Sequence, residues 1–256
     1  MRILVSNDDG VHAPGLAVLE RVAAELSDDV WVVAPENEQS GAARALSLST
    51  PLRVREAGHQ KFAVYGTPTD CVVMGMETLV EGKRPDLVLS GVNRGQNIAE
   101  DVTLSGTIAA AFQGMSLGVP SIALSQSRRG GQTVHWETAE RFAPRIIRNL
   151  VGSGWPPDVV MNVNFPAVPP EEVVAISAVS QGRREHLSIV PEQRTDLRGN
   201  PYYWFGFKGR RTAAAEGTDV HAMDNAAIAV TPLHLSLTHA DALASLQSRL
   251  TTLTIA

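Results

Sequence analysis

The stretch RILVSNDDGVHAPG (residues 2–15) contains the two features on which the interpretation of this chain depends. Residues 3–5 are an uninterrupted apolar run, which is typical of a strand covered on both faces. Shortly after this run come two adjacent carboxylates, Asp8 and Asp9. Two like charges at the end of a buried strand repel each other, so we expect a ligand or partner that offsets the repulsion.

Apolar runs alternate with helical patterns through the first two-thirds of the chain. The expected strands are residues 2–7, 29–36, 62–66, 86–93, 120–125 and 157–166, and the expected helices are residues 14–26, 67–80, 105–118 and 135–151. Alternating strands and helices with short connections predict an α/β fold with a doubly wound, mostly parallel sheet. In such a sheet, ligands bind at the carboxyl ends of the strands.

The sequence changes character after about residue 182. Residues 184–207 form two extended arms around Arg-Gly-Asn, which predicts a long β-hairpin that leaves the main sheet. Aromatic residues are concentrated in its second arm: Tyr202, Tyr203, Trp204, Phe205 and Phe207. We expect a core of residues 1–180 and a C-terminal extension of residues 181–256, in which residues 227–238 form one or two closing strands. A second subunit and the chain's own domain are the two candidates to cover the aromatic side.

The composition places the chain among ordinary globular proteins. It has 256 residues, of which 44% are hydrophobic and 19% charged, and a net charge of -5. The acidic balance argues against a general nucleic-acid surface, since binding to the nucleic-acid backbone needs a basic face. The single cysteine, Cys71, fits a reducing compartment. We find no signal-peptide pattern and no apolar run near the roughly 20 residues of a membrane span, so we expect a cytoplasmic protein with no membrane contact.

Oxygen-bearing side chains follow several of the predicted strands. Asp8 and Asp9 follow the first strand, Ser40 follows the second, and Asn93 lies at the end of the strand over residues 86–93. Two carboxylates with neutral oxygens form the kind of all-oxygen set that Mg²⁺ and Mn²⁺ favour. A divalent cation held there would also remove the repulsion between the two carboxylates. Asp8 and Asp9 are therefore candidate catalytic residues as well as candidate ligands.

The same edge of the sheet has features of an anion site. Gly41 and Gly106 permit close approach of the backbone, and a helix beginning near Ser105 directs N–H groups toward an anion. Asn97 and Thr107 are expected at the same edge. A cation site facing anion-binding amides indicates a phosphate ligand, and it leaves open whether water or a carboxylate attacks the phosphorus.

Several motifs together resemble the SurE family of survival-protein-E nucleotidases. They are SNDDGVHAPG (6–15), VVAPENEQSGA (32–42), YGTPTDCV (65–72), DLVLSGVNRGQN (86–97) and SGTIAAA (105–111), followed by RGNPYYW (198–204), EGTD (216–219) and TPL (231–233). The resemblance implies a Rossmann-like core whose C-terminal extension joins subunits into a homodimer or homotetramer. It also implies a phosphatase that acts on nucleoside 5′- and 3′-monophosphates, and in some members on short polyphosphate.

The resemblance also implies roles for individual residues. One divalent metal ion per subunit, Mg²⁺ or Mn²⁺, would be held by Asp8, Asp9, Ser40 and Asn93. The phosphate would be surrounded by Gly41, Asn97, Ser105, Gly106 and Thr107. Two alternatives remain open at this point: an aspartyl-phosphate phosphatase with Asp8 as nucleophile, and a non-catalytic protein that binds a nucleotide or phosphate.

Overall fold

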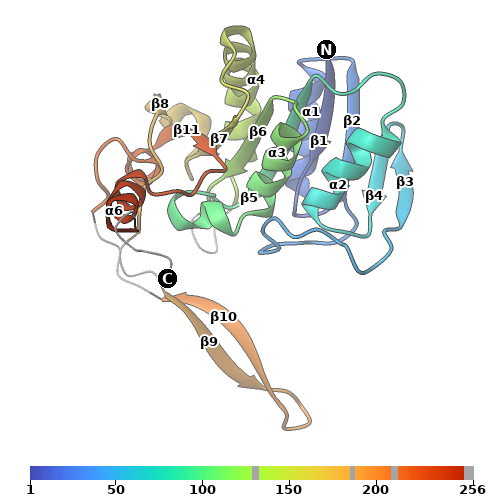
Figure 1. Cartoon of the computed structure of the whole chain (residues 1–256). Coiled ribbons are helices and arrows are strands. Elements are labelled where there is room, and N and C mark those ends of the chain that lie inside the picture. Colours follow the sequence, from blue (N-terminus) through green and yellow to red (C-terminus); the bar gives the residue numbers. More distant parts are fainter. Residues whose placement is uncertain (129–132, 185–187, 209–212, 251–256) are drawn as a thin grey trace.

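The computed structural model describes residues 1–128, 133–184, 188–208 and 213–250. Its largest element is a nine-stranded sheet with the strand order β3-β4-β2-β1-β5-β6-β7-β11-β8 (Figure 1). The strands of this sheet are β1 (Arg2–Ser6), β2 (Asp29–Pro35), β3 (Val54–Gly58), β4 (Lys61–Val64), β5 (Leu87–Arg94), β6 (Ser121–Gln126), β7 (Val159–Phe165), β8 (Ala175–Ala178) and β11 (Ala227–His234).

The six strands from β4 to β7 run parallel to one another. At one edge β3 pairs antiparallel with β4, and near the other edge β11 pairs antiparallel with β7 and parallel with β8. The expected α/β fold with a mostly parallel sheet is confirmed. The strand order reverses at β1, which lies between β2 and β5. The carboxyl end of β1 is therefore the switch point at which ligands bind in folds of this kind.

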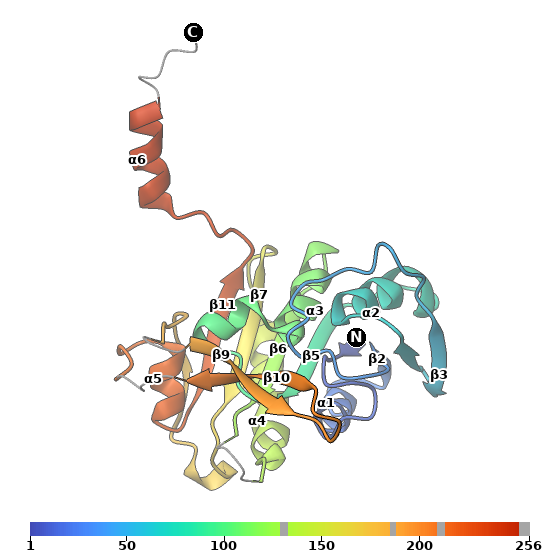
Figure 2. The same cartoon turned by 90° about the horizontal axis from the view of Figure 1, so that it is seen from below.

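Helices cover both faces of the sheet (Figures 1 and 2). They are α1 (Pro14–Ala24), α2 (Pro68–Met74) with the π-helical turn η1 (Gly75–Leu79), the 3₁₀ turn η2 (Ala99–Thr103), α3 (Gly106–Ser116), α4 (Trp136–Ser153), the 3₁₀ turn η3 (Pro170–Glu172), α5 (Asp219–Asp224) and α6 (Ala240–Leu250). Alternate residues of β1 explain the two layers. Ile3 and Val5 pack into the core that contains α1 and α4, whereas Leu4 packs into the core that contains residues of α2 and α3.

Helices α2 and α3 each begin with a side-chain cap. The Thr67 hydroxyl accepts the Asp70 N–H, and the Asp70 carboxylate accepts the Thr67 N–H, which is a reciprocal capping box at the start of α2. The Ser105 hydroxyl accepts the N–H of Ile108 at 3.0 Å at the start of α3. The caps fix where each helix begins and hence where its free N–H groups lie.

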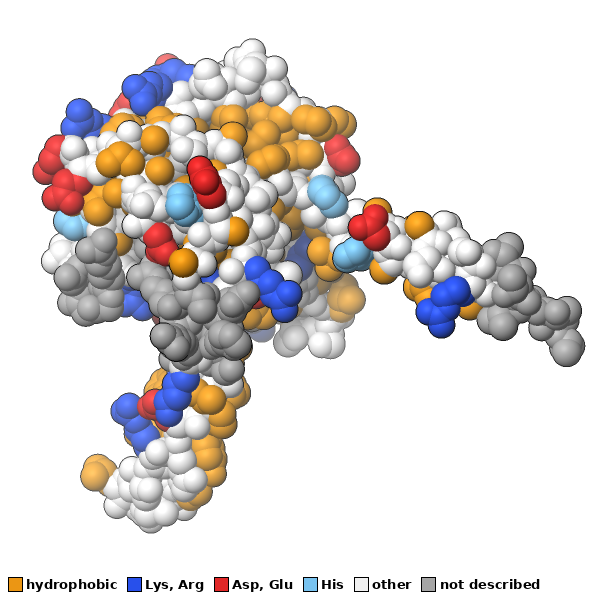
Figure 3. All heavy atoms as spheres, turned by 90° about the vertical axis from the view of Figure 1, so that its left-hand side faces the viewer, with side chains coloured by type: hydrophobic (Ala, Val, Ile, Leu, Met, Phe, Trp, Pro, Cys, Tyr) orange, Lys and Arg blue, Asp and Glu red, His pale blue; other side chains and the backbone are white. Residues whose placement is uncertain are grey.

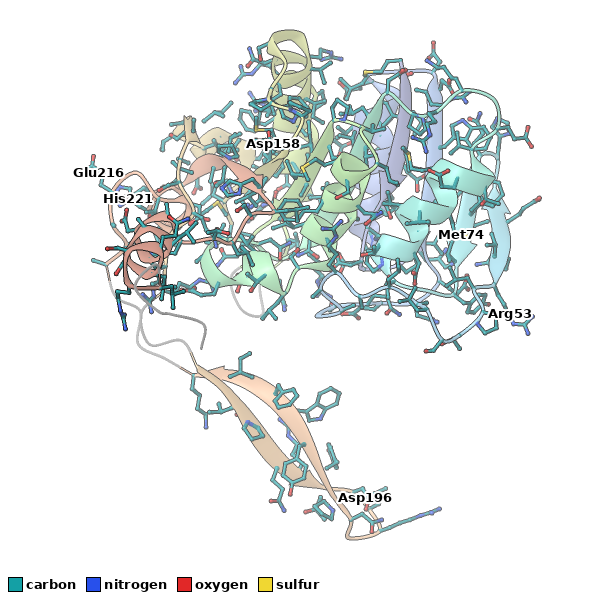
Figure 4. The ribbon with its side chains drawn as sticks, in the orientation of Figure 1. Arg53, Met74, Asp158, Asp196, Glu216 and His221 are labelled. Atoms are coloured by element: carbon teal, nitrogen blue, oxygen red, sulfur yellow. The ribbon has the colours of Figure 1, made fainter. Side chains whose placement is uncertain are left out.

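The hairpin of β9 (Ser188–Thr195) and β10 (Pro201–Lys208) is a separate two-stranded antiparallel sheet that projects from the body (Figure 1). Asp196 lies at its tip (Figure 4) and accepts the N–H groups of Arg198 and Asn200. Hydrophobic side chains line one side of the hairpin (Figure 3), and Trp204 and Phe205 are 62% and 78% exposed. The side chain of Phe207 is outside the part of the chain that the structure describes. The hairpin predicted from the sequence is thus present.

Of the remaining C-terminal elements, one belongs to the main sheet and another lies outside the body. β11 is a strand of the nine-stranded sheet, while α6 extends away from the body (Figure 2). The division into a core of residues 1–180 and an extension of residues 181–256 stays a prediction. The short elements β3, β8, α5 and α6 are not among those expected from the sequence. None of the helices in the described part of the chain is long and apolar enough to cross a membrane.

Candidate functional site

Asp8 lies where the carboxyl end of β1 meets the N-terminus of α3. Its side chain is buried, and its Oδ1 accepts the hydroxyl of Thr107 at 2.5 Å. Gly106 lies against the same carboxylate, because a Cβ at position 106 would come within 2.9 Å of Oδ2 of Asp8. The backbone carbonyl of Asp8 accepts the N–H of Gln39 at 2.8 Å. The structure thus brings Asp8 together with the start of α3 and with the loop that follows β2.

Asp9 joins the ends of β1 and β5. Its Oδ2 accepts the N–H of Arg94 at 2.9 Å, and its side chain is only partly buried. Arg94 follows Asn93, so this bond holds Asp9 next to another predicted metal ligand. The two adjacent carboxylates therefore differ in their surroundings: Asp8 is enclosed by α3, and Asp9 reaches toward β5 and solvent.

Asn93 and Ser40 contribute neutral oxygens at the same edge. The register of β5 against β6 shifts between Ser90 and Asn93, and such irregularities re-aim side chains at the ends of strands. The amide nitrogen of Asn93 donates to the carbonyl of Gly95 at 2.9 Å, so its amide oxygen is the atom suited to a cation. Ser40 is exposed, and its hydroxyl donates to Glu38 at 2.9 Å. Asn93 precedes Arg94, whose N–H bonds Asp9, and Ser40 follows Gln39, whose N–H bonds the carbonyl of Asp8.

Asn97 belongs to a buried polar network that the sequence interpretation missed. Its N–H donates to the side chain of Asn164 at 2.8 Å, and its own amide nitrogen donates to Ser125 at 2.9 Å. Its carbonyl accepts the side-chain amides of Asn162 and Asn164. The two β7 asparagines, two residues apart in the sequence, are a signal for polar groups on one face of a buried strand. Their contacts show that Asn97 is firmly held, with its amide nitrogen bonded to Ser125.

The glycines predicted near a phosphate have different environments. Gly106 is in tight contact with Asp8, as described above. Gly41 has a φ of +81°, a left-handed conformation that favours glycine, and a Cβ there would meet nothing within 4 Å. The left-handed turn is therefore the observed reason for glycine at position 41, and close packing is the reason at position 106.

A buried aspartate outside the predicted set holds the loop that carries Ser40 and Gly41. Asp70 accepts the N–H and the hydroxyl of Ser47 at 3.0 and 2.7 Å, in addition to the N–H of Thr67. The Thr67 hydroxyl donates to the carbonyl of Ala45 at 2.8 Å. These bonds connect the far end of the loop to the start of α2, and they hold the pKa of Asp70 below its usual value despite its burial. This contact links residues 23 apart and has no local sequence signal.

The donor set fits a hard divalent cation. Within the described residues, no group of three or more His, Cys, Asp and Glu side chains could hold a metal ion. A site at this edge would consist of two carboxylates and neutral oxygens, which suits Mg²⁺ or Mn²⁺ with retained water and does not suit zinc. The buried hydroxyls of Ser6 and Ser90, which pair in register on β1 and β5, have no hydrogen-bond partner. Ser6 is the last residue of β1, two residues before Asp8, and unpartnered buried polar atoms at this strand end are consistent with a site that takes polar ligands.

Comparison with known proteins identifies the family. The profile described as "Survival protein SurE" matches residues 3–188. The chain belongs to the SurE family. A relative named "5'-nucleotidase SurE" from Caulobacter vibrioides strain NA1000 / CB15N is 61% identical over 242 residues, covering 93% of this chain and 92% of the relative. Another of the same name, from Caulobacter sp. strain K31, is 57% identical over 253 residues, covering 98% and 94%.

A solved structure gives the same result for the fold. The chain is similar to the crystal structure of SurE protein from Aquifex aeolicus, with a TM-score of 0.82 and 37% identity. The similarity covers 97% of this chain and 99% of the Aquifex chain. The resemblance to the SurE family stated from the motifs is thus confirmed. The roles of single residues in the site stay predictions.

Burial is the main cause that raises the pKa values of the two SurE carboxylates, Asp8 and Asp9. Burial, with a smaller contribution from the neighbouring Asp9 charge, raises the pKa of Asp8 to about 6, although the Thr107 hydroxyl opposes this shift. Burial also raises the pKa of Asp9, against the effect of the Arg94 N–H. A charged Asp8 is therefore unfavourable in the metal-free protein at neutral pH, and a bound cation would stabilise it.

The pKa of Asp8 predicts how metal-free stability depends on pH. Because the folded pKa of about 6 lies above the unfolded value of 3.8, the contribution of Asp8 to stability is full below about pH 4. It is lost as the pH rises through about 6, by about 3 kcal/mol in total. Urea unfolding with a chelator, at several pH values from 4.5 to 8, measures the effect in wild type and in Asp8→Asn. The free energy of unfolding of Asp8→Asn relative to wild type should increase with pH, and a difference independent of pH would contradict the assignment.

Gly106→Ala tests the contact between α3 and Asp8. The new Cβ would lie 2.8 Å from Cβ of Asp8 and 2.9 Å from its Oδ2, so either the carboxylate or the start of α3 must move. We expect phosphate release to fall by about 10²-fold, since displacements of about 1 Å near reacting atoms have effects of this size. Gly152→Ala on α4 is the matched control, because a Cβ there would meet nothing within 4 Å. Equal activity of the two variants would show that this contact is not needed.

Proposed function

We propose that this SurE chain is a nucleotidase that hydrolyses nucleoside 5′- and 3′-monophosphates to a nucleoside and phosphate, with one divalent metal ion per subunit. The observation that carries the proposal is the position of Asp8 and Asp9. Both lie at the switch point of the sheet, and Asp8 contacts the first residues of α3. The relatives described above, which are named 5'-nucleotidase, support the same activity.

Asp8, Asp9, the amide oxygen of Asn93 and the hydroxyl of Ser40 would hold the metal ion. Bound Mg²⁺ or Mn²⁺ supplies Lewis-acid stabilisation of the phosphoryl charge and orients the reacting groups. The chain itself contributes by holding two adjacent carboxylates at the end of β1. Burying a charged carboxylate costs free energy, and this cost appears as the raised pKa of Asp8. The Thr107 hydroxyl then fixes the orientation of the Asp8 carboxylate.

The N-terminus of α3 would bind the phosphate. The Ser105 hydroxyl accepts the N–H of Ile108, and the backbone N–H of Thr107 interacts with the Asp8 carboxylate. The N–H of Gly106, in the first turn of α3, has no partner within the helix and would be available to a phosphate. Gly106 keeps the helix end close to Asp8, so that the phosphate and the carboxylates share one position. Gly41 lies in the loop held by Asp70 and would approach the phosphate from the opposite side. Asn97 would complete the set from the end of β5.

Asp9 would orient the attacking water. Its Oδ2 accepts the Arg94 N–H and the side chain is only partly buried, so its other oxygen would be the one that faces the water. Asp8 is enclosed and bonded to Thr107, so it serves as a fixed ligand. Attack by water distinguishes this proposal from the alternative in which Asp8 forms a phosphoenzyme. Mass spectrometry of enzyme quenched during turnover separates the two, because a phosphorylated Asp8 would support only the alternative.

Phosphate release from 5′-AMP and 3′-AMP, measured with Mg²⁺ and with Mn²⁺, tests the proposed function. We expect release from both nucleotides with at least one of the metals. A short polyphosphate in the same assay tests the additional substrate that the family resemblance implies. Absence of release from any nucleotide with either metal would refute the enzymatic proposal and favour a protein that only binds nucleotides.

The hairpin would join subunits into a homodimer or homotetramer. Its exposed Trp204 and Phe205, on an arm that projects from the body, present apolar area that an isolated chain leaves in water. Sedimentation of wild type and of a variant with both residues changed to Ser tests this arrangement. A lower oligomeric state of the variant is the expected result.

A further inference from the structure

Asp219, the last residue of the EGTD motif, is fully buried at the start of α5. Its Oδ2 accepts the N–H of Ala99 at 3.0 Å, and its Oδ1 accepts the N–H of Gly182 at 2.8 Å. Ala99 is the first residue of η2, and Gly182 lies shortly before the hairpin. Such bonds stabilise a buried carboxylate, because an unpaired charge is costly to bury. Asp219 therefore connects two segments that are distant in the sequence.

Ala99 has a backbone conformation that depends on these contacts. Its φ is +51°, in the left-handed region that is unfavourable for residues other than glycine, and its side chain is fully buried. Its N–H is bonded to Asp219, and its carbonyl accepts the side-chain amide of Gln181 at 2.8 Å. Strained conformations of this kind persist where the surrounding contacts hold them. Both polar backbone groups of Ala99 are thus held by the C-terminal part of the chain.

Ala99 lies two residues after Asn97, which is a proposed phosphate contact. The backbone of Asn97 is bonded from another direction, by the two asparagines of β7. Between them, Ile98 packs with Val220 of α5 in one apolar cluster. Because only one residue separates the two anchored positions, a change of φ at Ala99 would shift the chain at residues 97 and 98. The position of Asn97 therefore depends on contacts from β7 and from the segment around Asp219.

We propose that Asp219 is a positioning residue of the enzyme, which holds Ala99 in its left-handed conformation and thereby places Asn97 for contact with the phosphate. The inference rests on the proposed function and adds a residue of α5 to those on which phosphate binding depends. Asp219 acts through Asn97, since both of its carboxylate oxygens are bonded to backbone N–H groups. The nearest proposed metal ligand, Asn93, is held separately through its bond to Gly95. Loss of Asp219 should therefore weaken phosphate binding and spare metal binding.

The test measures phosphate affinity and metal affinity separately in Asp219→Asn. The new amide nitrogen cannot accept a hydrogen bond, so the N–H of either Ala99 or Gly182 loses its partner. The KM for AMP and the dissociation constant of inorganic phosphate, measured by calorimetry with Mn²⁺ present, should each rise about tenfold, the effect of weakening one hydrogen bond to a charged group. The kcat and the dissociation constant of Mn²⁺ should stay close to their wild-type values. Gln181→Met removes the bond to the Ala99 carbonyl and should act in the same direction, so it tests the inference even where Asp219→Asn does not fold.

Thr218→Ala is the matched control for disturbance of α5. The Thr218 hydroxyl caps the same helix, and its hydrogen bonds go to Ala215 and His221. This variant should lose stability but keep the wild-type KM and phosphate affinity. An equal rise of KM in Thr218→Ala would overturn the inference, because the effect would then come from α5 in general.

The remaining outcomes are also distinct. Wild-type KM and phosphate affinity in the folded Asp219→Asn and Gln181→Met variants would overturn the inference. An equal loss of Mn²⁺ affinity would overturn it as well, since Asp219 would then support the whole site. If wild type binds inorganic phosphate but releases none from AMP, the proposed function fails, while the phosphate affinities of the variants still decide the role of Asp219. Absence of phosphate binding by wild type would overturn both.

Discussion

Replacing Asp8 by Asn is expected to lower kcat/KM for AMP by about 10³-fold or more, while the folded protein remains intact. A loss of this size corresponds to about 4 kcal/mol of transition-state stabilisation. The reason is that Asn retains the hydrogen bond to Thr107 but removes the charge that would hold the cation. Steady-state phosphate release, with circular dichroism to verify folding, measures the effect.

The substitution separates function from stability. Because a charged, buried Asp8 is unfavourable in the metal-free protein, Asp8→Asn should be at least as stable as wild type at pH 7.5 in the presence of a chelator. Asp29→Asn is the matched control. Asp29 is the first residue of β2, at the amino ends of the strands and away from the carboxyl ends where Asp8 lies, and its carboxylate accepts a hydrogen bond from Arg2. That variant should retain activity. An Asp8→Asn enzyme with wild-type turnover would refute the role of Asp8.

Removal of divalent metal is expected to abolish phosphate release, again by about 10³-fold or more. Two carboxylates at one point leave the phosphoryl site with excess negative charge, and the N–H groups of α3 alone supply only part of the compensation. Dialysis against EDTA followed by assay, and then addition of Mg²⁺ or Mn²⁺, tests the dependence. Activity should return on addition of either suitable metal and should stay absent with Na⁺ at the same ionic strength.

The control for this experiment is to verify that the chelated protein remains folded. The nine-stranded sheet and its two apolar layers do not depend on the carboxylates, so the chelated protein should keep its secondary structure and its cooperative unfolding. Undiminished activity after exhaustive chelation would show that the chain performs phosphoryl transfer without a divalent ion. The metal proposal would then be wrong, although the SurE membership would stand.

The strands of the central sheet were predictable because burial on both faces leaves a simple pattern. Residues 3–5 and the strand from Leu87 are apolar at consecutive positions, and their side chains are buried in the structure. β3 lacks such a pattern, because four of its five residues are exposed at the edge of the sheet. β8 is similar. Edge strands owe their position to pairing with a neighbour, and nothing in their own sequence specifies that neighbour.

The candidate site was predictable where its residues follow strands directly. Asp8, Asp9 and Asn93 come at the ends of strongly apolar strands, and the rule for parallel sheets places them at one edge. The supporting contacts depend on residues far apart in sequence. Asn164 bonds Asn97 across 67 positions, and Asp70 bonds Ser47 across 23. Such pairs become visible only when the fold brings their elements together.

The most direct test of the account is anomalous diffraction from crystals grown with Mn²⁺. The account predicts one strong manganese peak per subunit, coordinated by the carboxylates of Asp8 and Asp9 and by the amide oxygen of Asn93, and no such peak in Asp8→Asn. Manganese bound elsewhere, or the same peak undiminished in Asp8→Asn, would contradict it.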